Sequence, residues 1–313
     1  MDISFLIVSW NVRELLQRAI ESILKDASEY ETEIIIVDNA SSDGTREMLE
    51  MVFPSKTFPN VRVIANTENR GFTRGNNQAL EVAKGQYLFF LNPDTELLTG
   101  ATRALMEFMD APENARVGIV GPQLLWPDGS LQYSRRRFPT FSTAFFEFHQ
   151  LQKWFPLNGV LEHVYMRDTR DDQTQDVDWL VGAAMFARRA VYEQIGGFDE
   201  RFYMYSEELD WCKRAKGAGW RVVYFPCARV LHYEGKSSEQ VLALRDIYFH
   251  SSKVRYYKKY FGEWQGELLR YFLLTMFAYQ TLEEGVKYIL GHKRPLRAAR
   301  VKAYRQVMAS GLR

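Results

Sequence analysis

The 313-residue sequence lacks the features that mark disulfide-stabilised, membrane-spanning and nucleic-acid-binding proteins. Its two cysteines, Cys212 and Cys227, are too few for a disulfide framework or a cysteine-rich zinc site, and they predict thiols in a reducing compartment. No run of roughly 20 uncharged apolar residues is present, so we expect no transmembrane span. The net charge of +1 gives the whole chain no attraction to nucleic acid, and we expect no nucleic-acid partner.

Targeting and nucleotide-binding motifs are equally scarce. The opening MDISFLIVSWN has no basic leader, and its short apolar run fits a strand better than a signal peptide, which predicts a cytoplasmic protein. No G-x-G-x-x-G follows this first strand, so a dinucleotide-binding domain is not expected. The segment YEGKSS at 233–238 is not a phosphate-binding P-loop, because Val230 stands where the earlier glycine is required.

Strand and helix patterns alternate over the first hundred residues. The strand patterns fall at 3–10, 33–39, 61–66 and 86–92, and the helix patterns at 13–25, 41–52 and 74–85. Strands that are apolar throughout are covered on both faces. The alternation therefore predicts an α/β protein with a mostly parallel central sheet flanked by helices.

The pattern changes from Gly118 onward. We expect a strand, a turn at 127–129 and a return strand, then a strand and helix within 177–200 and a capped helix over 206–219. A strand pair is predicted over 221–235, and a helical tail from about Ser238. The predicted domains are a catalytic domain over 1–240, with halves 1–100 and 101–240, and a basic helical extension over 241–313.

Polar residues follow four consecutive predicted strands. They are Ser9 and Asn11, Asp38 and Asn39, Asn66 and Asn69, and Asn92 and Asp94. Ligands bind beyond the carboxyl ends of the strands in parallel sheets. Four polar strand ends on one edge predict a single site there, whereas one such end would more often be an ordinary loop.

The segment YLFFLNPDTELL, residues 87–98, ends an apolar strand in Asn-Pro-Asp. Asp94 could bind Mg²⁺ or Mn²⁺, which favour oxygen ligands together with substrate phosphates. Pro93 would direct this side chain by fixing the local backbone. Asp94 or Thr95 could instead cap a following helix, and these residues alone do not decide between the two interpretations.

A second acidic cluster lies in YSEELDWC, residues 205–212. Glu207, Glu208 and Asp210 fall in the first turn of a predicted helix, where acids are ordinarily stabilising. Three acids this close also repel one another, which should raise the pKa of at least one of them. A carboxylate of this kind could act as a general base toward a hydroxyl.

Two further features admit both a structural and a functional interpretation. His232, at a predicted strand end, is either a structural hydrogen-bonding residue or a metal ligand beside Asp94. The arginines at 135–137 are either a solvated charge run or a phosphate-binding group.

The motifs taken together resemble those of glycosyltransferase family 2, particularly bacterial rhamnosyltransferase-like members. They occur in order as IVSWN, VDNASSDGT, NRGFTRGNNQAL, FLNPDTEL, DGSLQYSRRRFPT, the long segment from Asp178 to Trp220, and HYEGKSS. The resemblance covers about residues 2–240. It implies a glycosyltransferase A fold and inverting transfer from a nucleoside-diphosphate sugar.

The resemblance also implies roles for individual residues. Nucleotide-sugar contacts are expected from Ser9, Asn11, Asp38, Asp43, Asn69, Gly71, Phe72, Gly75, Asn76 and Asn92, and acceptor contacts from Trp179, Gly182, Ala183, Ala184 and Arg135. Asp94, with His232, would hold Mg²⁺ or Mn²⁺, and Asn92 departs from the family's second carboxylate. Glu208 takes the usual position of the base, with Glu207 and Asp210 as the other catalytic candidates.

The expected partners follow from the same resemblance. The donor would be a dTDP- or UDP-linked sugar, with rhamnose as the first candidate, and the acceptor a glycan or a polyprenyl-linked glycan. A nucleotidyltransferase or a non-catalytic sugar-nucleotide binder is the alternative. The tail from Val286 has eight Lys or Arg and no Asp or Glu, so it would either touch the inner face of the cell membrane or pack on protein, as in a homodimer.

Overall fold

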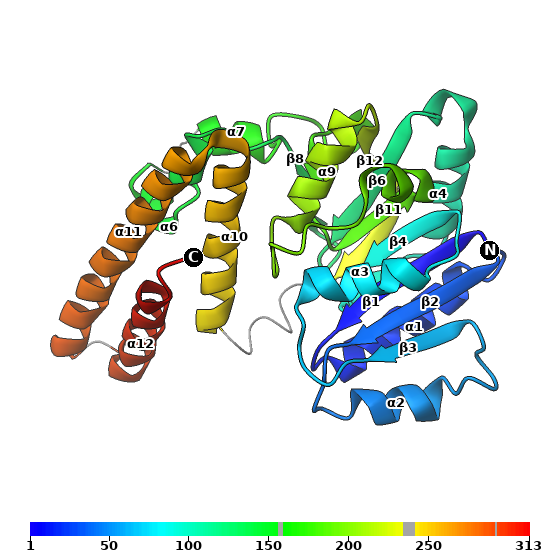
Figure 1. Cartoon of the computed structure of the whole chain (residues 1–313), viewed down its shortest axis with the longest axis horizontal. Coiled ribbons are helices and arrows are strands. Elements are labelled where there is room, and N and C mark those ends of the chain that lie inside the picture. Colours follow the sequence, from blue (N-terminus) through cyan, green and yellow to red (C-terminus); the bar gives the residue numbers. More distant parts are fainter. Residues whose placement is uncertain (156–158, 234–241, 292) are drawn as a thin grey trace. The chain divides into compact units, whose positions relative to one another are not determined.

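A computed structural model describes residues 1–155, 159–233, 242–291 and 293–313 (Figure 1). The contacts divide the chain into two compact units. The first unit comprises the described residues of Met1–Phe138, Tyr165–Tyr203 and Glu207–Ser237, and the second those of Pro139–Val164, Met204–Ser206 and Ser238–Arg313. The predicted domain boundary at 240 lies outside the described residues.

The first unit contains the sheet and its covering helices. Its elements are β1 (Ile3–Ser9), α1 (Arg13–Asp26), β2 (Thr32–Asp38), α2 (Thr45–Val52), β3 (Val61–Ala65), α3 (Phe72–Val82), β4 (Tyr87–Leu91), β5 (Thr95–Leu97), α4 (Ala101–Asp110), the 3₁₀-helix η1 (Pro112–Asn114), β6 (Val117–Leu125), β7 (Leu131–Gln132), β8 (Arg135–Arg136), β9 (Gln175–Asp176), β10 (Trp179–Leu180), β11 (Ala184–Arg188), α8 (Arg189–Ile195), α9 (Glu207–Gly217) and β12 (Arg221–His232).

The strand order is β3-β2-β1-β4-β11-β6-β12-β5. Strands β3, β2, β1 and β4 are parallel to one another, β11 is antiparallel to both β4 and β6, and β12 is parallel to β6. The mostly parallel α/β architecture predicted from the sequence is therefore confirmed. The carboxyl ends of the first four strands meet at one edge, with Ser9 opposite Asp38 and Asp38 opposite Ala65.

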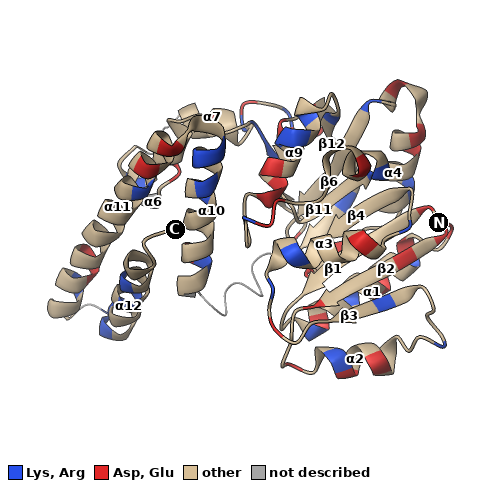
Figure 2. Cartoon of the chain, in the orientation of Figure 1, with Lys and Arg blue, Asp and Glu red and all other residues tan. Residues whose placement is uncertain are grey.

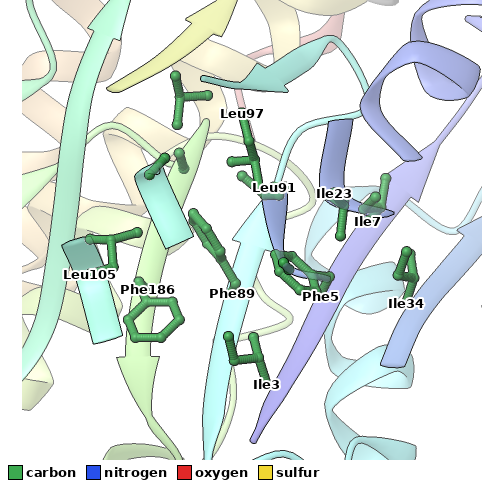
Figure 3. Packing of buried hydrophobic residues seen from close by; sticks show 14 of the residues in the cluster. Ile3, Phe5, Ile7, Ile23, Ile34, Phe89, Leu91, Leu97, Leu105 and Phe186 are labelled. Carbon is green, nitrogen blue, oxygen red and sulfur yellow. The ribbon is translucent and has the colours of Figure 1, made fainter. Parts of the chain in front are cut away.

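Each face of the sheet is covered by a separate hydrophobic cluster. Along β1, Ile3, Phe5 and Ile7 pack with residues of α1, α2 and α4, while Leu6 and Val8 pack with residues of α3, α8 and α9. Figure 3 shows the first cluster, in which Phe5, Phe89 and Phe186 lie in one row across three strands. Side chains that alternate between two covered faces explain why these strands are apolar throughout.

Three details of the predicted elements are wrong. The helix predicted to end at Gly85 ends at Val82 in α3. The pair predicted over 221–235 is a single strand, β12, whose pairing with β6 shifts register between Phe225 and Arg229. No helix follows Asp94, because Thr95–Leu97 form β5 and pair with β12, so the helix-cap interpretation of Asp94 and Thr95 is wrong.

The second unit is helical. Its elements are α5 (Thr143–Phe146), α6 (His149–Trp154), α7 (Gly159–Val164), α10 (Leu242–Phe261), α11 (Glu263–Ile289) and α12 (Arg294–Ser310). Helices α10, α11 and α12 pack against one another, as Figure 1 shows. In the part of the chain that the structure describes, every helix is too short or too polar to span a bilayer.

Candidate active site

The end of β4 brings a carboxylate, an amide and an imidazole together. Oδ1 of Asp94 lies 3.4 Å from Nε2 of His232, and Nδ2 of Asn92 lies 3.4 Å from the same ring nitrogen. Asp94 and His232 are 5% and 4% exposed. Pairing of β5 with β12 places Thr95 opposite His232, which explains how residues far apart in sequence meet here.

The other ring nitrogen of His232 has its own partner. Nδ1 lies 2.8 Å from Oε1 of Gln132, which is itself buried. Because an amide oxygen only accepts, Nδ1 carries the proton in this arrangement and Nε2 keeps a lone pair directed toward Asp94 and Asn92. Oδ1 of Asn92 is buried and has no hydrogen-bond partner in the described chain. The carboxylate of Asp94, the amide of Asn92 and Nε2 of His232 therefore lie close together, and the amide oxygen has no hydrogen-bond partner in the described chain.

Asn92, Asp94 and His232 can be compared with what a small cation site requires. Among the described residues, no group of three or more His, Cys, Asp or Glu side chains could hold a metal ion, and the trio has only two such residues plus an amide. Carboxylate and amide oxygens suit Mg²⁺ and Mn²⁺, with substrate phosphates supplying further ligands. The residues therefore fit a divalent cation that is shared with a diphosphate.

The start of α9 has two carboxylates without side-chain partners. Oε2 of Glu207 and Oε2 of Glu208 are both buried and have no hydrogen-bond partner in the described part of the chain. Burial, and then the charge of Glu208, raise the pKa of Glu207 well above its usual range. Burial also raises the pKa of Glu208, although nearby backbone N–H groups, including that of Gly182, and the Arg136 charge oppose the change.

Asp210 differs from its two neighbours on α9. It is fully buried, and its Oδ2 accepts a hydrogen bond of 2.8 Å from Nε of Arg214. The same guanidinium donates to the carbonyl oxygens of Ile195 and Gly197, each at 2.7 Å. Asp210 therefore anchors α9 to the loop after α8, and the structure does not bring it to the site as a base.

The segment Gly182–Ala184 connects the two acidic centres. The N–H of Gly182 is among the backbone groups that favour the charged form of Glu208, and a Cβ atom on this glycine would come within 3.4 Å of the Glu208 side chain. One residue later, the carbonyl oxygen of Ala183 accepts a hydrogen bond of 2.9 Å from the N–H of Asn92. Consecutive backbone groups thus position the carboxylate of Glu208 and the amide-bearing end of β4.

The predicted acceptor residues have different environments. Trp179 is half-buried, lies opposite Arg136 in the β8–β10 pair, and donates from Nε1 to the carbonyl oxygen of Arg137 at 3.0 Å. Ala183 and Ala184 are 1% and 2% exposed as whole residues, so in this structure neither presents a surface to an acceptor.

Arg135 is not available to an acceptor in this structure. It is 1% exposed, and its Nη2 donates to the carbonyl oxygens of Met166 and Thr169. Arg137 is held by Asp168 in a two-point ion pair of 2.8 and 2.9 Å. Arg136 is the arginine whose charge reaches Glu208. Neighbouring strand residues face opposite sides, which is why one arginine of this run is placed unlike the next.

The loops after β1 and β2 are joined by hydrogen bonds at the nucleotide end of the sheet. Oδ1 of Asn11 accepts from the N–H of Ser42 at 2.7 Å, and the N–H of Asn11 donates to Oγ of Ser41 at 3.0 Å. Asn11 and Ala40 both have positive φ angles, 53° and 60°, which are uncommon outside glycine. The loops are therefore held in a specific conformation.

The polar side chains of these loops are largely engaged or buried. Asp38 is fully buried and pairs with Nε of Arg46 at 2.8 Å. Burial opposes ionisation of Asp43, but hydrogen bonds from Thr45 and from the N–H of Arg13 outweigh it and lower the pKa of that carboxyl. Oγ of Ser9 is buried and without a partner in the described residues, so it remains a candidate contact.

The residues at the start of α3 contact Tyr203. Gly71 has φ of 87°, and a Cβ atom there would come within 2.8 Å of Tyr203, whose hydroxyl donates to Asn69. Phe72 donates from its N–H to the carbonyl oxygen of Tyr203. These contacts hold Asn69, Gly71 and the first residue of α3, Phe72, against Tyr203.

Gly75 and Asn76 lie inside the fold instead. A Cβ atom on Gly75 would come within 2.7 Å of Val8, so the glycine allows α3 to pack closely on β1. Asn76 is 1% exposed and donates to the carbonyl oxygen of Phe72. Both residues pack inside the fold in this structure, and their predicted contact with ribose and diphosphate stays a prediction.

Three residues of the site were not predicted from the sequence. Gln132 depends on the β6–β7 pairing that places it opposite Leu124, and this register is not evident from the sequence. Arg136 is one of the three consecutive arginines noted in the sequence. The alternation of side chains along a strand could have indicated that Arg136 and Arg135 face opposite sides. Tyr203 had no distinguishing signal, because its contact with Gly71 joins segments more than a hundred residues apart.

The sequence matches a known protein family over most of its length. The model of the family described as glycosyl transferase family 2 matches residues 4–196. The chain is 30% identical over 234 residues to an N-acetylglucosaminyl-diphospho-decaprenol L-rhamnosyltransferase of Mycobacterium tuberculosis, covering 71% of this chain and 73% of that protein. It is 24% identical to the rhamnosyltransferase WbbL of Escherichia coli, covering 73% of this chain and 82% of that protein.

Solved structures with low sequence identity share the fold. A mannosyltransferase, PcManGT of Pyrobaculum calidifontis, in complex with GDP-Man and Mn²⁺, has a TM-score of 0.54 at 15% identity, over 99% of this chain and 86% of that chain. GalNAc-T7 with UDP, GalNAc and Mn²⁺ has a TM-score of 0.58 at 18% identity, over 79% of this chain and 47% of that chain. The predicted glycosyltransferase A fold with a helical C-terminal region is confirmed.

Proposed function

Because the chain belongs to glycosyl transferase family 2, whose members use nucleotide sugars, we propose that it inverts the anomeric centre of its donor sugar during transfer. The nucleotidyltransferase and non-catalytic binder alternatives are not favoured by these relatives. The acceptor is a hydroxyl of a glycan or of a polyprenyl-linked glycan. The observation that carries the proposal is that consecutive residues contact both acidic centres: Gly182 lies against the side chain of Glu208, and Ala183 accepts a hydrogen bond from the N–H of Asn92 in the Asn92–Asp94–His232 trio.

The donor occupies the carboxyl edge of β1, β2 and β4. Asn11, Asp38 and Asp43 hold the loops that surround the nucleoside, and Ser9 offers its unpartnered hydroxyl from the floor of the site. The loop of Asn69, Gly71 and Phe72 lies toward the ribose. Rhamnose linked to dTDP or UDP is the first donor to test, since two similar proteins are named as rhamnosyltransferases.

Asp94, His232 and Asn92 would hold a divalent cation. The unpartnered oxygen of Asn92 is consistent with this role, and the contact of Nδ1 with Gln132 leaves Nε2 of His232 as the nitrogen that would face the cation. A neutral imidazole among the ligands favours Mn²⁺ over Mg²⁺. When bound, the cation would neutralise the negative charge that develops on the departing diphosphate.

Glu208 acts as the general base, and Glu207 keeps a proton. Two adjacent buried carboxylates do not both ionise readily, and the backbone N–H groups and Arg136 favour the charge on Glu208. Glu208 would remove the acceptor hydroxyl proton as the acceptor oxygen bonds to the anomeric carbon. The bond from that carbon to the diphosphate oxygen breaks in the same step, which inverts the configuration.

The test is a donor panel scored by the configuration of the product. Purified protein would be incubated with each nucleoside-diphosphate sugar and a simple glycan acceptor, with Mn²⁺ or with chelator. Transfer with inversion at the anomeric carbon, seen by NMR and dependent on the cation, is the expected result. A retained configuration would contradict the direct displacement, and equal rates in chelator would contradict the cation site.

A further inference from the structure

Helix α11 exposes a continuous uncharged face along its whole length. The face, here called the α11 stripe, consists of Trp264, Leu268, Tyr271, Thr275, Ala278, Leu282, Val286 and Ile289, all of them exposed. Their spacing of three or four residues places them on one side of the helix. Trp264, Leu282 and Ile289 are 69%, 71% and 75% exposed, which is unusual for large apolar side chains.

The opposite side of α11 already forms the core of its unit. Leu269, Leu273 and Phe277 are buried, and α11 packs on α10 and α12. The stripe is therefore not needed to hold the helices together. A large exposed apolar surface of this kind ordinarily marks an interaction site.

Basic side chains lie next to one end of the stripe. Figure 2 shows Lys and Arg, and no Asp or Glu, on α12. Lys302 and Arg305 line a cavity of about 630 Å³ with Tyr288 and Ile289 of α11. Within the described chain neither cation has an ion-pair partner, whereas Arg297 is already paired with Glu284.

We propose that the α11 stripe and the adjacent Lys302 and Arg305 form a docking surface for an anionic lipid bilayer. Helices that lie in the bilayer interface combine an apolar face, often with Trp and Tyr, and neighbouring Lys or Arg that meet lipid phosphates. The α11 stripe supplies the apolar face, and Lys302 and Arg305 supply the neighbouring charges at the cavity that Ile289 also lines. The inference deepens the proposed polyprenyl-linked acceptor, but lipid binding can be measured without any transfer reaction.

A second copy of the chain fits this surface less well. Helix pairs that associate through such a seam commonly carry complementary charges beside it. Here the charged side chains nearest the stripe are already paired within the chain, Glu267 with Lys258 and Arg270, and Glu283 with Lys287. Parallel pairing would also place the two basic α12 segments near each other, where they repel.

The test is co-sedimentation of the full chain with vesicles at low and high salt. One vesicle preparation is phosphatidylcholine alone, and the other is an equimolar mixture with phosphatidylglycerol. Leu282→Gln with Ile289→Gln should weaken binding to the mixed vesicles on the order of tenfold. Lys302→Glu with Arg305→Glu should weaken it at least as much, and only for the anionic vesicles.

The control is Met51→Gln, which removes an apolar side chain that is 75% exposed on α2, outside the stripe. It should bind vesicles as the wild type does, and unchanged thermal unfolding would show that all variants are folded. Wild-type vesicle binding by both double variants would overturn the proposal. Loss of a dimer by Leu282→Gln with Ile289→Gln, seen by light scattering without any vesicle binding, would identify the stripe as a subunit interface instead.

Discussion

The end of β4 and the start of α9 both place carboxylates beside the segment Gly182–Ala184, but their surroundings differ. Asp94 lies beside His232, whose far nitrogen is fixed by Gln132. Glu207 and Glu208 each have a buried oxygen with no partner in the described chain. We propose that Asp94 shares its charge with a bound cation, whereas burial raises the pKa of Glu207 and Glu208 so that one of them can accept a proton. On this proposal, the surroundings of each carboxylate decide its task.

The strongest way to test this contrast is Glu208→Gln. Removing a general base costs about 10²–10⁴ in rate, and kcat should fall by this amount while nucleotide binding is unchanged. In the wild type, kcat/KM should fall as the pH is lowered. The midpoint of this fall should lie above the ordinary glutamate value of 4.5, because burial raises the pKa of Glu208. Steady-state kinetics across pH and calorimetry with the nucleotide would measure both effects.

Glu207→Gln is the matched variant for that experiment, because it removes the neighbouring carboxyl group of the same size. It should keep most of the transfer rate. If Glu207→Gln abolished transfer and Glu208→Gln retained wild-type turnover, the two roles would have to be exchanged.

Gln132→Leu tests whether the tautomer of His232 matters at the other centre. Loss of a residue that orients a metal ligand typically weakens metal affinity by about 10- to 100-fold, and we expect this for Mn²⁺. Electron paramagnetic resonance titration of Mn²⁺ would measure the affinity without any turnover. Gln123→Leu is the control, since Gln123 also donates within the sheet, to the Tyr224 hydroxyl at 3.1 Å. Equal Mn²⁺ affinity in both variants and the wild type would remove Gln132 from the site.

The smallest expected effect is on stability, from Glu207→Gln. In the wild type the folded-state pKa of Glu207 lies above its unfolded value of 4.5. The protein therefore becomes less stable as the pH rises from 4.5 through the folded-state pKa of this group. The variant should therefore be more stable than the wild type at neutral pH, by on the order of 1 kcal/mol, and not below pH 4.5. Urea unfolding at several pH values would measure the difference.

Asp210→Asn should lower the stability of the protein, which is the opposite of the change expected for Glu207→Gln on the same helix. Asp210 is paired with Arg214, and losing a charged partner of a buried group costs about 1–3 kcal/mol. If Glu207→Gln destabilised the protein at neutral pH as Asp210→Asn does, burial of Glu207 would not be the unfavourable feature that we infer.

The sheet edge was predictable because few arrangements bury fully apolar strands. Strands 3–9 and 87–91 need cover on both faces, and the helices between them then make the sheet parallel. Their polar ends must meet once the sheet is parallel, so the positions of Ser9, Asp38 and Asp94 followed from the pattern alone. The association of Asp94 with His232 additionally needed the antiparallel β5–β12 pair.

The remaining features depend on packing that a linear pattern does not contain. Gly75 and Asn76 look like ligand residues in the sequence, but Gly75 packs closely on Val8, and Asn76 is buried and donates to the carbonyl oxygen of Phe72. Arg135 is held by carbonyl groups from a segment about thirty residues away. Gln132 reaches His232 only through the register of a short hairpin. Each of these outcomes is decided by tertiary contacts rather than by local residue preference.

The contacts made by Gly182 and Ala183 have an evolutionary consequence, because both are made by main-chain atoms. Substitution changes side chains but leaves N–H and C=O groups in place. If the proposed site is correct, we expect relatives to exchange the side chains around the acceptor while main-chain groups keep the spacing of the two acidic centres. The choice of substrate could then change without altering the reaction.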